Sequence, residues 1–173
     1  MIKQFGWQFV SMLLAVTVAS VAVSVWALFI REPKTVLIPD YAPQEEEQYA
    51  DPIPGTEEQA PWKENSGSVS LNYSDRVVVD TNELLAHLYF ANPGKSNHDI
   101  VLQIVIQGEM IAQSGLIKSG HKISQIALSD GVEDLLLPGG YDGNFMIYYY
   151  DPISNERSMV NTEIPVYITV PEK

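Results

Sequence analysis

The sequence predicts an all-β domain, a two-layer β-sandwich of about seven to eight strands, preceded by an N-terminal transmembrane helix and a disordered linker. Three observations predict this layout: an uncharged apolar run near the N-terminus, an acidic proline-rich stretch after it, and short alternating apolar runs from Ser68 onward. A chain of 173 residues has room for one core-bearing domain with appendages. We therefore divide it into residues 1–30, 31–67 and 68–173.

The first segment has the length of a membrane anchor. From Phe5 to Ile30 there are 26 residues without a charge, whereas about 20 helical residues cross a hydrocarbon core. Trp7 and Trp26 lie near its ends, where amphipathic rings favour the membrane interface. A cleavable signal peptide is the alternative, but the apolar run exceeds the roughly 7–15 residues of the hydrophobic region of a signal peptide. We expect an uncleaved single-pass anchor that contacts the lipid bilayer through residues 5–30.

The second segment, residues 31–67, has the composition of a solvated linker. It holds nine acidic residues against three basic ones, and six prolines interrupt both helix and sheet. Such a stretch is typical of an extracytoplasmic stalk, so we place the C-terminal domain outside the cell membrane. Trp62 is the exception in this linker, and we expect its indole to pack on the domain or on a partner.

From Ser68 onward the chain alternates between apolar and polar residues, as a half-buried strand does. Turn signals such as NPGKSN and LPGGYDG separate the strand-like runs, and only DGVEDLLL suggests a single helical turn. The runs are RVVVD, ELLAHLYFA, DIVLQIVIQ, EMIAQSGLI, KISQIAL, NFMIYYY and EIPVYITV. This pattern indicates a β-sandwich, with a closed barrel as the alternative.

The stretch from Leu137 to Tyr141, LPGGY, precedes an alternating strand. It resembles the tyrosine corner of immunoglobulin-like and fibronectin-type sandwiches, which implies that the Tyr141 hydroxyl bonds to the backbone upstream while the glycines form a tight turn. In layout the chain resembles small single-pass surface proteins of Gram-positive bacteria. The domain lacks cysteine and tryptophan, so no functional residue of immunoglobulin domains is carried over.

Composition excludes several classes of function. The net charge of −12 argues against duplex nucleic acid as a partner, because phosphate binding needs clustered Lys and Arg. The absence of cysteine removes disulfides, thiolate nucleophiles and zinc–thiolate sites. The Gly94-Lys95-Ser96 tripeptide lacks the preceding glycine of a phosphate loop, and the three histidines form no metal-binding pair. We therefore expect neither an enzyme nor a cofactor.

The tyrosine run 148–150 is the best candidate binding site. If Tyr149 faces the core, then Tyr148 and Tyr150 face outward beside Met146 and form an amphipathic contact surface. Trp62 of the linker is a further candidate for this binding site. The alternative is that cross-strand packing or the linker covers this face. A calcium site is a further hypothesis, with Asp130, Glu133, Asp134 and Asp142 as its ligands.

These features predict a membrane-anchored extracytoplasmic binding module. In the leading version it is a non-catalytic structural or accessory subunit of a bacterial cell-surface or envelope-spanning assembly, and a sheet edge or the tyrosine face contacts a partner protein. The alternative is a module that binds cell-wall glycan. A degenerate enzyme or inhibitor domain would need a cluster of polar residues, and the sequence displays none.

Overall fold

The computed structural model of the protein describes residues 12–17, 20, 38–55 and 70–172. Its internal contacts divide the chain into two units, Met1–Leu37 and Ile38–Lys173. In the first unit, residues 12–17 and Ser20 are helical and exposed. No helix among the described residues has both the length and the apolar character of a membrane span. Most of the predicted anchor lies outside the described residues, so membrane anchoring stays a prediction.

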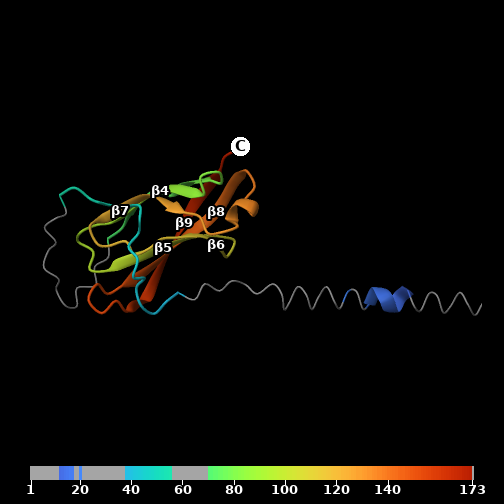
Figure 1. Ribbon diagram of the computed structural model, residues 1–173, viewed down its shortest axis with the longest axis horizontal. Coiled ribbons are helices and arrows are strands. Elements are labelled where there is room, and N and C mark those ends of the chain that lie inside the picture. Colours follow the sequence, from blue (N-terminus) through green and yellow to red (C-terminus); the bar gives the residue numbers. More distant parts are fainter. Residues whose placement is uncertain (1–11, 18–19, 21–37, 56–69, 173) are drawn as a thin grey trace, which may run out of the picture. The chain divides into compact units, whose positions relative to one another are not determined.

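The second unit is built from strands, and the all-β prediction is confirmed (Figure 1). The sheet order is β1-β7-β4-β3-β9-β8-β5-β6, and β2 pairs with β4 beside this path. Within the described part of this unit, helical structure is limited to the 3-10 turn η1 (Val132–Asp134), where the sequence predicts one turn. The strands are β1 (Ala50–Pro52), β2 (Asn72–Tyr73), β3 (Arg76–Asp80), β4 (Leu85–Asn92), β5 (Asp99–Ile106), β6 (Glu109–Gln113), β7 (His121–Ala127), β8 (Gly139–Tyr150) and β9 (Arg157–Val170).

The strands form one continuous mixed sheet that curls around its core. Strand β3 joins the two halves, because it pairs antiparallel with β4 and parallel with β9. Phe90 of β4 packs edge-on against Phe145 of β8 across the core, with ring centroids 6.1 Å apart. The strand order is open, with β1 and β6 at its ends. An isolated bridge between Ala112 and Leu128 and a hydrogen bond from the Ser129 amide to the Ile111 carbonyl link β6 to the end of β7. A division into two separate layers is not confirmed and stays a prediction.

Alternating burial explains why these sequences form strands. In β3, Val77 and Val79 are fully buried while the residues between them face outward. Strand β5 differs, because nearly all of its residues are buried. Ile100, Leu102 and Ile104 belong to the main core, whereas Val101 belongs to a second apolar cluster on the opposite face. Something therefore covers the outer face of β5.

The start of β8 contains the bond of a tyrosine corner. The Tyr141 hydroxyl donates a hydrogen bond to the Leu137 carbonyl at 2.7 Å. The glycines do not form the tight turn that the sequence predicts, because β8 already begins at Gly139. Gly143 instead permits close packing, since a Cβ there would lie 2.8 Å from the Val105 carbonyl oxygen. Gly140 and Gly143 therefore serve close approach within the sheet.

Candidate functional site

The outer face of β5 and β8 is covered by residues 38–47, which we call the strap. Tyr148 is 7% exposed and Tyr150 is 0% exposed. They form an apolar cluster with Val101 and Leu116, and the Tyr150 hydroxyl donates to the Pro39 carbonyl at 3.2 Å. Partly buried residues of the same cluster are Ile38, Ala42 and Met146. The predicted exposed patch at Tyr148 and Tyr150 is therefore wrong, and the alternative of cover by the linker describes the structure.

Backbone hydrogen bonds hold both ends of the strap. At one end, the Ala42 amide donates to the Asn155 carbonyl at 2.7 Å and the Arg157 amide donates to the Asp40 carbonyl at 2.8 Å. At the other end, the Glu47 amide donates to the Leu116 carbonyl at 3.0 Å. Strand β1 then adds to β7. The expectation of a solvated linker is thus wrong for residues 38–55, whereas residues 31–37 and 56–67, with Trp62, lie outside the described residues.

A buried carboxylate fixes the far end of the strap. Glu47 accepts hydrogen bonds from the Gly115 amide at 2.7 Å and from the Tyr49 amide at 3.1 Å. Gly115 has no side chain, and a Cβ there would lie 2.9 Å from the backbone of both Glu45 and Glu47. Only glycine therefore allows the strap to lie this close to the domain.

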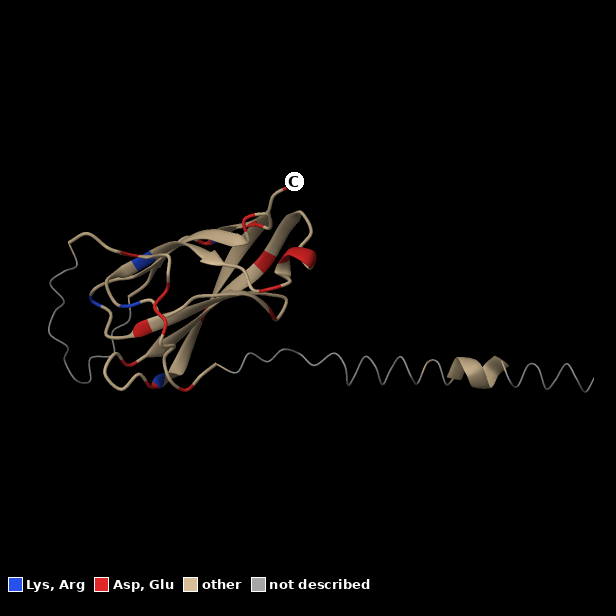
Figure 2. Ribbon diagram, in the orientation of Figure 1, with Lys and Arg blue, Asp and Glu red and all other residues tan. Residues whose placement is uncertain are grey.

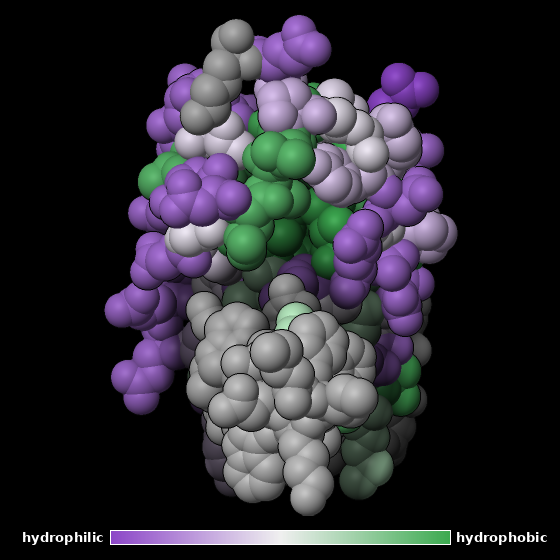
Figure 3. All heavy atoms as spheres, turned by 90° about the vertical axis from the view of Figure 1, so that its right-hand side faces the viewer, coloured by the Kyte–Doolittle hydropathy of each residue, from purple (hydrophilic) through white to green (hydrophobic). Residues whose placement is uncertain are grey.

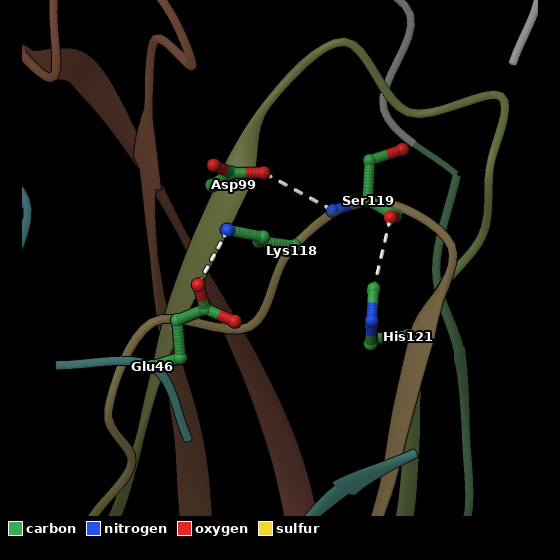
Figure 4. A network of polar contacts seen from close by, with 5 residues as sticks. All are labelled: Glu46, Asp99, Lys118, Ser119 and His121. Atoms are coloured by element: carbon green, nitrogen blue, oxygen red, sulfur yellow. Dashed lines mark hydrogen bonds and ion pairs between the residues drawn. The ribbon is translucent and has the colours of Figure 1, made fainter. Parts of the chain in front are cut away.

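An ion pair crosses from the strap to the domain beside this point (Figure 4). The Lys118 ammonium lies 2.5 Å from the Glu46 carboxylate; this partner lowers the pKa of Glu46 and raises that of Lys118. Both side chains are largely exposed, so the pair contributes little to stability. Asp99 lies beside this pair (Figure 4) and accepts a hydrogen bond from the Ser119 amide at 3.1 Å. Its burial raises the pKa of its carboxyl group. The network fixes the strap and shows no arrangement for catalysis.

One side of β9 is unpaired over residues 158–166 within the described part of the chain, and we call this stretch the open edge. At one end Arg157 bonds to Asp40 of the strap, and at the other β3 pairs only with residues 167–169. Pro165 lies in the stretch and has no amide hydrogen to offer. Met159 and Val160 are 106% and 68% exposed. This part of β9 therefore presents both backbone groups and apolar side chains to a potential partner.

A second apolar surface lies at the η1 end of the domain. Figure 3 looks onto this end and shows apolar residues gathered within a hydrophilic surround. Leu135 and Leu137, which follow η1, are among the exposed apolar residues. Figure 2 shows that η1 itself is acidic. An exposed apolar surface of this kind marks a contact region, but its position alone does not define the partner.

The calcium hypothesis finds no support in the positions of its ligands. Asp130, Glu133 and Asp134 lie in and just before η1, whereas Asp142 lies in β8 and lines a separate hollow. Among the described residues, which include all four, no group of three or more acidic or histidine side chains could hold a metal ion. The loop end of the domain therefore does not form the predicted site.

Comparison with known proteins places this chain in no family. No protein-family model matches it, and no curated protein sequence matches it. Among solved structures, the CooA pilin subunit from enterotoxigenic Escherichia coli matches with a TM-score of 0.28 and 15% identity. The match covers 61% of this chain and 99% of the pilin. A similarity this low does not indicate a shared function.

The sequence suggested cover by the linker and a contact at a sheet edge, but it did not identify the residues of the strap or the extent of the open edge. The available signal for the strap was the presence of apolar residues inside an acidic stretch, notably Ile38 and Ala42. The open edge depends on where β3 leaves β9, which is a pairing between distant parts of the chain. No local pattern in β9 reports that pairing, although Pro165 is typical of an edge strand.

Proposed function

We propose that this protein is a non-catalytic binding module of a cell-surface or envelope-spanning assembly, anchored in the membrane with its β domain outside the cytoplasm. A partner protein adds an extended segment to the open edge of β9. The single observation that supports this most is that, among the described residues, one side of β9 has no pairing partner over residues 158–166.

An unpaired strand edge is a template for another strand. Successive residues of a strand direct their backbone groups to opposite sides. The Tyr167 amide donates toward β3, to the Asp75 carbonyl. Alternation therefore directs the amide and carbonyl groups of Asn161 and Glu163 to the open side. Proteins usually block such edges with prolines, charges or bulges. In this chain the open edge is limited to one short segment by Pro165, by the charge of Glu163 and by a register shift in the β8–β9 pair.

The edge also has the side chains of a contact surface. Met159 and Val160 are exposed at its start, and an added strand would cover both. Main-chain hydrogen bonds would supply affinity, and these side chains would supply selectivity. Tyr148 and Tyr150 are not available as an alternative contact site for the partner, because the strap covers their face of the sheet.

The test removes one donor from the open edge without touching the β8 pairing. Replacing Glu163 with proline deletes the outward amide, and Glu163→Ala removes only the charge. The tagged full chain is crosslinked in intact cells and purified with its partner. We expect the partner to be lost with Glu163→Pro and kept with Glu163→Ala. Circular dichroism should show the same strand content in both variants.

Topology is checked on the same cells. Protease added outside should remove a C-terminal tag, because the β domain is proposed to lie outside. Retention of the partner by a folded Glu163→Pro variant would refute the proposed contact, and a protected C-terminal tag would refute the proposed location.

A further inference from the structure

A hollow of about 320 Å³ lies where β3 separates from β9, at the Pro165 end of the open edge. Its wall on β9 is formed by residues 165–167, and its wall on β8 by residues 142–144, with Asp75 completing the rim. The volume is at the lower end of the range for ligand sites, which begins at about 300 Å³. It fits one side chain or another small group.

The hollow combines an aromatic ring with two carboxylates. Tyr167 is 53% exposed and lies directly opposite Asp142 in the β8–β9 register. Its hydroxyl lies over Gly140, where a Cβ would collide with it. The Tyr167 amide bonds to the Asp75 carbonyl at 2.8 Å, which holds the second acid beside the ring. Tyrosine, Asp142 and Asp75 thus border the same small space.

These groups are complementary to a cation. Among the described residues, neither Asp75 nor Asp142 forms an ion pair. A cation gains from charge-assisted hydrogen bonds to carboxylates and from contact with an aromatic face. A planar guanidinium suits the site better than an ammonium, because it can stack on a ring while its fork donates to carboxylate oxygens. The chain's charge of −12 attracts such a partner over longer distances.

One basic residue of the chain lies nearby and must be considered. Arg76 is opposite Tyr167 in the parallel β3–β9 register and is exposed. It does not line the hollow. The positive charge of Arg76 repels a cationic ligand. Replacing Arg76 with an uncharged residue should therefore not weaken binding of the ligand to the hollow.

We propose that this hollow binds the guanidinium of an arginine side chain carried by the partner segment that adds to the open edge. The inference rests on the proposed function, since the hollow adjoins the end of that edge at Pro165. It adds the chemical identity of one partner residue to the strand contact. The chain then recognises an extended basic segment.

The test uses the full chain in a polyoxyethylene detergent, which carries neither a cation nor a sugar. The probe is a capped Gly-Arg-Gly peptide, and nuclear magnetic resonance follows the backbone amide signals of Asp142, Gly143 and Val166, which line the hollow and are present in every variant. We expect saturable shifts. Asp142→Asn and Tyr167→Leu should each weaken binding at least about fivefold, as expected for the loss of a charge-assisted contact. Tyr167→Phe, which keeps the ring, and Arg76→Ala should bind at least as tightly as the unchanged protein.

A control variant measures the general attraction of the peptide to an acidic protein, by removing charges that do not line the hollow. The double variant Asp130→Asn and Glu133→Gln removes more charge than Asp142→Asn but should leave binding within about twofold, because neither residue lines the hollow. Equal weakening in this control would overturn the proposal. The absence of saturable shifts would also overturn it. So would shifts of these amide signals caused by a trimer of N-acetylglucosamine and not by the peptide, which would assign the hollow to glycan.

The two proposals fail separately. If Glu163→Pro abolishes partner capture while Asp142→Asn leaves both capture and peptide binding unchanged, the open edge is a contact site and the guanidinium proposal is wrong. If peptide binding follows the pattern above but Glu163→Pro keeps the partner, the hollow binds arginine without an added strand.

Discussion

A fragment that begins at Ser70 is expected to unfold at a much lower urea concentration than a fragment that begins at Ile38. The shorter fragment lacks the strap and β1, so Tyr148 and Tyr150 lose their cover. Exposing a large apolar side chain costs about 1.5–3 kcal/mol. The two tyrosines alone therefore predict a loss of roughly 3–6 kcal/mol in the free energy of unfolding, comparable to the total stability of a small domain.

Circular dichroism in urea measures this difference, and the fluorescence of an apolar dye reports the uncovered face. A third fragment that begins at residue 56 is the matched control, because it lacks the strap and β1 but keeps residues 56–69. It should be as unstable as the fragment from Ser70. Equal stability of all three fragments would show that the strap does not stabilise the domain.

Substitution of Gly115 by alanine is expected to loosen the strap without shortening the chain. The added Cβ would lie 2.9 Å from both the Glu45 carbonyl oxygen and the Glu47 amide nitrogen. These are backbone atoms, so the strap has to move away, and the hydrogen bond from the Gly115 amide to the Glu47 carboxylate is strained. Overpacking of this kind costs about 1–3 kcal/mol.

A comparison of two backgrounds separates this clash from any intrinsic effect of alanine. In the fragment from Ser70 the strap is absent, so Gly115→Ala should leave the urea midpoint nearly unchanged. In the fragment from Ile38 it should lower the midpoint and increase dye fluorescence. The same loss in both backgrounds would mean that Gly115 serves the local fold rather than the strap.

The sequence predicted the features that local patterns determine. Alternation located most of the strands, although it missed β1 and the first part of β9. It correctly assigned Tyr149 to the main core. The same parity placed Tyr148 and Tyr150 on the opposite face, which the structure agrees with. The error concerned what lies over that face, because the cover comes from a segment more than 100 positions away in sequence.

The strap was hard to predict because its stability comes from tertiary contacts. Its prolines and acidic residues are typical of a solvated segment. However, the Pro39 carbonyl accepts a hydrogen bond from the Tyr150 hydroxyl, and the Glu47 carboxylate accepts one from the Gly115 amide. A buried carboxylate that accepts two backbone hydrogen bonds cannot be distinguished in sequence from its exposed neighbours Glu45 and Glu46. The open edge was hidden for a similar reason, since it depends on the parallel pairing of β3 with β9.

Hydrogen exchange of four consecutive β9 amides tests the open edge most directly. In the full chain without its partner, the amides of Thr162 and Ile164 should exchange slowly because they face β8, whereas those of Asn161 and Glu163 should exchange nearly as fast as in an unfolded peptide. Addition of the partner should then slow exchange at Glu163. Slow exchange at all four amides in the isolated protein would show that the edge is already covered and would contradict the proposed contact.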